Sequence, residues 1–354
     1  MNKGRIKKLI EKAVSKFSLD LSGLTVLTEA ASGYYSLTPI IAAAGRAESV
    51  LALTRDSQYG RASEIHDLTL DLAHQFGIDS KIEILFKRDD PRIKSADIVT
   101  NLGFVRPINK DFLLKLKKSV VIPLMWETWE YRQEDLDLQE CRRLGIPVLG
   151  TNENHPDLEI YRYVGLLAIK LLFELDIEVF RSKILVIGSG DFGKYTIQSL
   201  LAAGALVSQL DIIKGDSLKD YKCRNTIRDC DAIVLVEHVS GDSLISHDGQ
   251  ITPNELYELN PSVSIAHISG GVNREELIEA GIPCIPKKFA SPGYMSVATD
   301  YMGPSPLINL HTVGLKIGEC LARAIQNGMY AIDAELEVLN ELEYAQGFGE
   351  IHKR

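Results

Sequence analysis

The stretch KILVIGSGDFG, residues 183–193, decides the fold of this 354-residue chain. Its apolar, branched residues predict a buried strand, and three glycines then lead into residues 194–203, which carry apolar side chains at helical spacing. One glycine allows a tight turn, the next lets the backbone approach a pyrophosphate, and the third lets the helix pack on the strand. The phosphates would bind the free N–H groups at the start of the helix.

A second strand-like run, residues 206–210, follows and ends on Asp211. At about this distance an acidic side chain binds the ribose hydroxyls of the adenosine, and its charge would repel the 2′-phosphate of NADP. The glycine motif alone could be a glycine-rich turn, but strand, loop, helix, strand and acid together predict a dinucleotide site that prefers NAD. The predicted cofactor-binding residues of this segment are Gly188, Ser189, Gly190, Asp191, Phe192, Gly193 and Asp211.

Length and composition indicate a soluble protein of two domains. A hydrophobic content of 45% is ordinary for a globular chain, and a net charge of −9 argues against nucleic-acid or membrane partners, which need basic surface. The chain has no apolar run long enough for a membrane span, and its charged N-terminal segment is unlike a signal peptide. Five scattered cysteines predict neither disulfides nor a metal site. We therefore expect a cytoplasmic protein.

The chain alternates strand-like and helix-like segments, which predicts doubly wound parallel α/β domains. We expect an α/β substrate domain over residues 1–155 and a dinucleotide-binding domain over 156–305. The last helices, 306–354, would return to the first domain. In the first domain, strands are expected near 24–28, 49–54, 82–87, 97–101, 119–124 and 147–150, and helices near 4–17, 36–45, 61–76, 110–118 and 133–144. In the second, strands are expected near 232–236, 263–267 and 283–285, and a helix follows at 311–327.

Three loops of the first domain follow predicted strands, at the sheet edge where open α/β folds bind ligands. The candidate substrate-binding residues are Glu29 and Tyr35 in the first loop, Arg55 in the second and Trp126 in the third. An arginine fork suits a carboxylate or phosphate. Serines and aspartates of the same loops are as well explained as helix caps. The tryptophans could form a substrate wall or an interface.

Residues 145–327 resemble the D-isomer-specific 2-hydroxyacid dehydrogenases, the formate/glycerate dehydrogenase-like group. The resemblance lies in GIPVLGTN at 145–152, in the glycine loop with Asp211, in NPSVSIAHISGGV at 260–272 and in LHTVG at 310–314. It implies a flavodoxin-like substrate domain, a Rossmann NAD-binding domain and a cleft between them. It also implies hydride transfer between the nicotinamide and a hydroxy or oxo substrate.

The resemblance further implies a catalytic set. The family uses an arginine for the 2-oxo acid, a histidine for the carbonyl proton and a carboxylate that orients the histidine. His311 matches the histidine, at the start of the returning helix, and Asp300 is the substitute for the carboxylate. Ser269 stands where the family has its arginine and would lie by the nicotinamide. His238, at a strand end facing the same place, is either a catalytic residue or a wall of the pocket.

The leading hypothesis is an NAD-dependent dehydrogenase or reductase of a small polar hydroxy or oxo metabolite. Because Ser269 replaces the arginine, we expect a substrate larger than a plain 2-hydroxy acid, held by the loops of Glu29 and Arg55. Two alternatives remain open: an enzyme whose tightly bound NAD oxidises the substrate only transiently, and a non-catalytic NAD sensor. By analogy with the architecture we expect a homo-oligomer, a homodimer above all.

Overall fold

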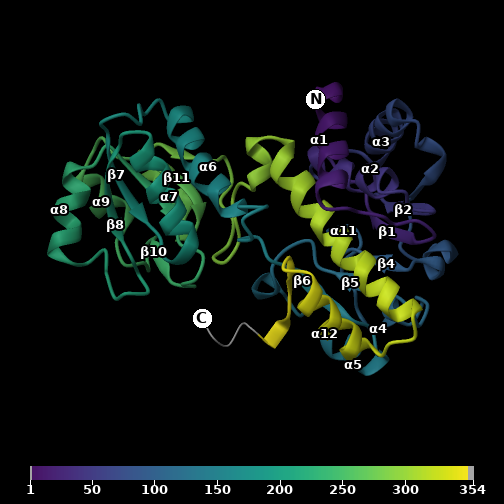
Figure 1. Ribbon diagram of the computed structural model, residues 1–354. Coiled ribbons are helices and arrows are strands. Elements are labelled where there is room, and N and C mark those ends of the chain that lie inside the picture. Colours follow the sequence, from purple (N-terminus) through teal and green to yellow (C-terminus); the bar gives the residue numbers. More distant parts are fainter. Residues whose placement is uncertain (1, 350–354) are drawn as a thin grey trace. The chain divides into compact units, whose positions relative to one another are not determined.

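The computed structural model describes residues 2–349, which form two compact units (Figure 1). Unit 1 combines the chain up to Leu158 with the residues from Pro304 on, and unit 2 is Glu159–Gly303. Each unit is a parallel sheet with helices, so the doubly wound α/β class expected from the sequence is confirmed. None of the described helices is long and apolar enough to cross a membrane.

The sheet of unit 1 runs in the order β3-β2-β1-β4, and a bridge between Ile98 and Val121 continues it to β5 and β6. This order, 3-2-1-4-5-6, is the one found in doubly wound dinucleotide-binding sheets. All pairs are parallel except the last, where β14 pairs antiparallel with β6. The strands are β1 Thr25–Glu29, β2 Ser49–Leu53, β3 Ile82–Leu85, β4 Ile98–Val99, β5 Ile122–Pro123, β6 Val148–Thr151 and β14 Ala345–Gln346.

Two helices of unit 1 are shorter than the sequence indicated. Helix α4 ends at Leu113, because the N–H groups of Lys115 and Leu116 bond three residues back and tighten the chain into a turn. Helix α5 starts late, at Leu138, because the Asp137 side chain accepts the N–H of Glu140 and caps it there. The helices are α1 Lys3–Lys16, α2 Leu37–Ala44, α3 Ala62–Phe76, α4 Lys110–Leu113, α5 Leu138–Leu144, α11 Pro304–Gln326 and α12 Ala331–Glu341, with the 3-10 turns η1 Gly33–Ser36, η2 Asp79–Lys81, η3 Pro91–Ser95 and η4 Thr128–Glu130.

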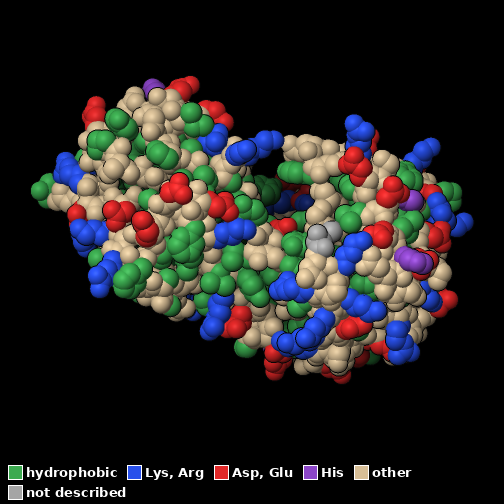
Figure 2. All heavy atoms as spheres, turned by 90° about the horizontal axis from the view of Figure 1, so that it is seen from above, with side chains coloured by type: hydrophobic (Ala, Val, Ile, Leu, Met, Phe, Trp, Pro, Cys, Tyr) green, Lys and Arg blue, Asp and Glu red, His purple; other side chains and the backbone are tan. Residues whose placement is uncertain are grey.

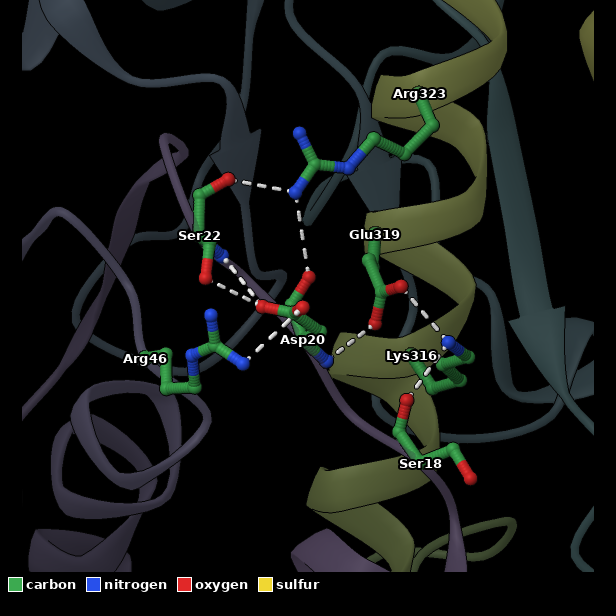
Figure 3. A network of polar contacts seen from close by, with 7 residues as sticks. All are labelled: Ser18, Asp20, Ser22, Arg46, Lys316, Glu319 and Arg323. Atoms are coloured by element: carbon green, nitrogen blue, oxygen red, sulfur yellow. Dashed lines mark hydrogen bonds and ion pairs between the residues drawn. The ribbon is translucent and has the colours of Figure 1, made fainter.

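Helix α11 ties the end of the chain to its beginning, since it packs beside α1 and α2. Glu319 accepts the backbone N–H of Asp20 at 2.8 Å, and Arg323 donates to the carbonyl of Ser22 at 2.6 Å. These bonds satisfy the backbone of the loop after α1 and hold α11 at one position. Ser18, Arg46 and Lys316 complete the network (Figure 3).

Unit 2 has a five-stranded parallel sheet in the order β13-β11-β9-β7-β8. Alternate side chains of β7 enter two separate apolar cores, one closed by α6 and α7 and the other by α8, α9 and α10. A strand buried on both faces needs the unbroken apolar run that predicted it. The strands are β7 Lys183–Ile187, β8 Leu206–Leu210, β9 Ala232–Val236, β11 Ser264–Ser269 and β13 Cys284–Ile285, with a pair β10 Ser243–Ile245 and β12 Gly271–Val272. The helices are α6 Ile160–Glu174, α7 Gly190–Ala202, α8 Tyr221–Asp229, α9 Pro253–Leu259 and α10 Arg274–Glu279, and η5 Thr299–Met302 precedes Gly303.

The surface carries both signs of charge. On the face that Figure 2 presents, lysine and arginine side chains are interspersed with acidic ones. A phosphate backbone is bound by a continuous basic surface, and this face does not present one.

Candidate functional site

The glycine loop joins β7 to α7 as predicted. Helix α7 begins at Gly190, with Ser189 at its N-cap position, and the Ser189 side chain makes no cap hydrogen bond. The first N–H groups of a helix have no partner within it, and the helix dipole adds positive potential there. An anion such as a pyrophosphate could therefore bind at this end of α7.

Each glycine of the loop is required by its surroundings. A β-carbon on Gly188 would lie 2.4 Å from Val236 Cγ2, and one on Gly193 would lie 2.5 Å from the carbonyl oxygen of Gly188. Gly190 has a φ of +58°, a conformation that side chains disfavour. The next residues of the helix, Asp191 and Phe192, are half-buried and buried respectively. The loop thus has the close strand–helix packing that the motif predicts.

Asp211 follows β8 and lies beside the glycine loop. Its carboxylate is hydrogen-bonded to the Ser189 side chain, and Lys214 Nζ lies 3.0 Å away. Burial acts to raise the pKa of Asp211, but the hydrogen bonds from Ser189 and Lys214 and the charge of Lys214 outweigh it, so the pKa is lowered. A carboxylate at this position can accept hydrogen bonds from two ribose hydroxyls.

The strand ends on the other side of β7 carry His238 and Ser269. The His238 ring stacks on Phe192 with 4.1 Å between ring centroids, and burial lowers its pKa, so the ring is neutral at physiological pH. Ser269 is the last residue of β11 and is completely buried. Sequence reasoning missed the neighbouring Glu237, also completely buried. The sequence did contain a signal for Glu237, since this acidic residue directly follows the apolar strand β9.

Unit 1 brings Glu29, Arg55 and Trp126 to one edge of its sheet through the segment after β4. The Phe104 N–H donates to Glu29 Oε2 at 2.7 Å, and the Arg55 guanidinium lies 5.2 Å from the centre of the Phe104 ring. The Arg106 guanidinium lies 5.1 Å from the Trp126 ring centre. Arg106, from the segment after β4, thus brings a second guanidinium to this edge of the sheet.

Glu29 is a buried carboxyl group that can hold a proton at neutral pH. Burial raises its pKa to about 7, against the opposing effects of the Phe104 N–H, Arg106 and Arg55. A group with a pKa near the working pH is the best suited to acid–base catalysis. Glu29 was predicted as a substrate contact, and its environment adds a capacity for proton transfer.

Two further carboxyl groups with raised pKa values are the half-buried Glu130 and the buried Glu153. Burial, and then the charge of Glu127, raise the pKa of Glu130 to about 7. Burial and the neighbouring Glu130 and Glu127 also raise the pKa of Glu153. Glu130, which follows β5, therefore remains partly protonated near neutral pH.

We expected His311 at the start of a helix. It lies instead within α11, which begins at Pro304. Its Nδ1 is 2.8 Å from the hydroxyl of Thr38, and the ring centre of Tyr35 is 6.1 Å from its own. Burial lowers the pKa of His311 to about 3, so its imidazole is neutral at physiological pH. The helix thus extends back to Pro304, and the His311 side chain is buried within unit 1.

Asp300 lies in η5 of unit 2, and burial raises its pKa. Since His311 belongs to unit 1, their pairing stays a prediction. Among residues 2–349, no group of three or more His, Cys, Asp or Glu side chains is arranged to hold a metal ion.

No protein-family model and no curated protein matches this chain. Solved structures do match. A dipicolinate synthase subunit from Bacillus halodurans has a TM-score of 0.54 at 12% identity and covers 84% of this chain and 99% of its own. D-Lactate dehydrogenase with NAD+ from Lactobacillus jensenii has a TM-score of 0.53 at 13% identity, over 85% and 97%. The pyruvate reductase of Chlamydomonas reinhardtii gives 0.52 at 12%, over 86% and 97%. At these identities the likeness concerns the fold, and the chain therefore has the fold of the D-2-hydroxyacid dehydrogenases that its sequence resembles.

Proposed function

We propose that this protein is an NAD-dependent oxidoreductase acting on a small polar hydroxy or oxo metabolite. The observation that carries the proposal is the glycine loop at the start of α7 with Asp211 hydrogen-bonded to its Ser189. The fold match to a D-lactate dehydrogenase whose structure was solved with NAD+ supports it.

The residues present fit a dinucleotide. The missing side chains of Gly188 and Gly190 leave the backbone of the loop open, and the N–H groups of α7 would hold the pyrophosphate. Asp211 would accept the adenosine ribose hydroxyls. At the carboxyl ends of β9 and β11, Glu237 Oε2 and Ser269 Oγ are buried. Neither atom has a hydrogen-bond partner among the described residues, as expected of groups that bind a ligand. Bound NAD would supply hydride transfer at its nicotinamide ring.

Unit 1 would bind the substrate. Arg55 and Arg106 would hold an anionic or polar group, beside the aromatic faces of Phe104 and Trp126. For the proton that accompanies hydride transfer we favour Glu29 over His311, the residue implied by the family resemblance. Glu29 has a pKa of about 7, whereas a histidine with a pKa of about 3 holds almost no proton at neutral pH.

The direct test is a calorimetric titration of the purified protein with NADH and with NADPH, after a check of the denatured protein for bound nucleotide. NADH-selective binding would support the proposal and justify a screen of carbonyl substrates. Copurified NAD would favour the alternative in which the cofactor oxidises the substrate only transiently. A protein that binds neither nucleotide would refute the proposal. The cytoplasmic location and the homodimer stay predictions from the sequence.

Replacing Asp211 by alanine is expected to weaken NADH binding about tenfold, because hydrogen bonds from ribose hydroxyls to a charged acceptor are lost. Rejection of NADPH should relax at the same time, since the like charge facing its 2′-phosphate is gone. Calorimetry on both nucleotides measures the two effects. Asp248→Ala, at a side chain that is 95% exposed, serves as the control. An unchanged preference for NADH in the Asp211 variant would remove this residue from the site.

A further inference from the structure

Two polar residues, Glu237 and Ser269, lie at the carboxyl ends of the adjacent strands β9 and β11 of unit 2. Each has a side-chain oxygen that makes no hydrogen bond within the described residues. In the register of β9 and β11, Ser269 lies opposite Val236, so Glu237 is its close neighbour along the sheet edge. Both side chains are completely buried, and neither Glu237 Oε2 nor Ser269 Oγ has a hydrogen-bond partner among the described residues. A buried polar atom without a partner lowers the stability of the folded protein. Two such atoms, at the carboxyl ends of neighbouring strands, indicate a place prepared for a ligand.

The Glu237 side chain is held in one orientation. Its Oε1 accepts the backbone N–H groups of Val239 at 2.8 Å and Ser240 at 2.9 Å, and these two donors stabilise a negative charge on the carboxylate. The other oxygen remains for a ligand. Gly270 makes room beside it: its φ is +131°, and a β-carbon there would lie 2.3 Å from Leu235 Cδ2 and 3.6 Å from Glu237 Cβ.

The strand order locates this pair relative to a dinucleotide. Asp211, which would bind the adenosine ribose, follows β8 at one edge of the sheet, and the glycine loop follows β7 next to it. A dinucleotide that crosses the loop must continue over the ends of β9 and β11. A β-carbon on Gly190 would lie only 3.4 Å from His238 Cε1, so the loop borders the residues that follow Glu237.

We propose that Glu237 and Ser269 bind the nicotinamide half of the dinucleotide, and that the Glu237 carboxylate makes the site bind NAD+ more tightly than NADH. The oxidised ring carries a positive charge and the reduced ring carries none, so a nearby carboxylate stabilises only the oxidised form. His238 does not compensate this charge, because its buried ring is neutral. This inference rests on the proposed function. Its consequence is that bound NADH becomes a stronger hydride donor, which favours reduction of the substrate.

The test is calorimetric measurement of the Kd for NAD+ and for NADH separately, on the wild-type protein and on Glu237→Gln. The amide keeps the shape of the side chain and an oxygen for the two N–H donors but removes the charge. We expect NAD+ to bind the wild type more tightly, and the ratio of the Kd for NADH to the Kd for NAD+ to fall about tenfold in the variant. Ser269→Ala, which removes no charge, should weaken both nucleotides alike.

Glu258→Gln is the matched control. Glu258 is exposed at the end of α9, close to the turn that leads into β11. It therefore lies near the amino end of a strand, whereas Glu237 follows the carboxyl end of β9. Its substitution removes the same charge from the same unit and should leave both Kd values unchanged. Thermal unfolding of each variant shows whether it is folded.

The possible failures are distinguishable. If the wild type binds neither nucleotide, the proposed function itself is wrong. If it binds NADH as tightly as NAD+ or more tightly, the role of Glu237 is refuted without any variant, even where Glu237→Gln does not fold. If both nucleotides bind and Glu237→Gln leaves the ratio unchanged, this inference is overturned while the proposed function stands.

Discussion

Replacing Gly193 by alanine is expected to weaken NADH binding about a hundredfold. The added β-carbon would lie 2.5 Å from the carbonyl oxygen and 2.8 Å from the carbonyl carbon of Gly188, both backbone atoms. The backbone of β7 cannot shift without breaking hydrogen bonds, because it is paired with β8 and β9 on its two sides. The start of α7 must therefore move away from the loop, and displacements of about 1 Å at a binding site can cost two orders of magnitude. Calorimetric titration with NADH measures the loss.

The same substitution should lower the free energy of unfolding by about 1–3 kcal/mol, as overpacking of a tight contact usually does. Gly241→Ala is the matched control, since a β-carbon at Gly241 meets no atom within 4 Å and this glycine lies in the same unit. It should change neither the Kd nor the stability appreciably. If Gly193→Ala bound NADH like the wild type, α7 would not be the pyrophosphate-binding helix, and the proposed function would lose its main support.

The dinucleotide unit was predictable from the sequence because its determinants are local. A buried strand, a turn that tolerates no side chain and an amphipathic helix occupy twenty consecutive residues, 183–202, and steric limits at Gly190 and Gly193 act over only a few of them. The acid at the end of the next strand follows from the spacing of the motif. Because these steric and spacing requirements act within one short segment, residues 183–202 can adopt few structures other than a strand, a tight turn and a helix.

The substrate-binding edge of unit 1 was less predictable, because its residues meet only in the folded sheet. The Phe104 N–H reaches Glu29 across a separation of 75 residues, and no periodic pattern encodes such a contact. The burial that raises the pKa of Glu29 depends on the whole surrounding structure. Likewise, α11 starts earlier than the sequence predicted, because its first turn carries a Pro-Ser-Pro sequence that resembles a helix breaker. Prolines fit the first turn of a helix, where their missing N–H is not needed.

Replacing Glu29 by glutamine is expected to lower turnover by two or more orders of magnitude once a carbonyl substrate is identified, because the side chain can no longer give or accept a proton. Binding of NADH should be unchanged, since Glu29 belongs to unit 1 and the glycine loop to unit 2. Steady-state kinetics and calorimetry separate the two effects. A fully active variant would show that another group moves the proton.

The same variant also tests the raised pKa without any substrate. The pKa of Glu29 is about 7 in the folded protein, against an ordinary value of 4.5. Below pH 4.5 both states are protonated, so Glu29 does not affect stability. Between pH 4.5 and 7 only the unfolded chain loses its proton, so the folded state is progressively disfavoured, by roughly 3 kcal/mol at pH 7 and above. Glu29→Gln lacks this penalty, so its stability advantage over the wild type should grow by that amount across this window and then stay constant. The other carboxyl groups with raised pKa values, Glu130 and Glu153, are present in both proteins, so their effects cancel in the difference. Denaturant unfolding at a series of pH values measures the difference, with Glu11→Gln at an exposed position of α1 as control. A difference that does not vary with pH would mean that Glu29 is ionised in the folded protein, and that it is not the proton carrier proposed here.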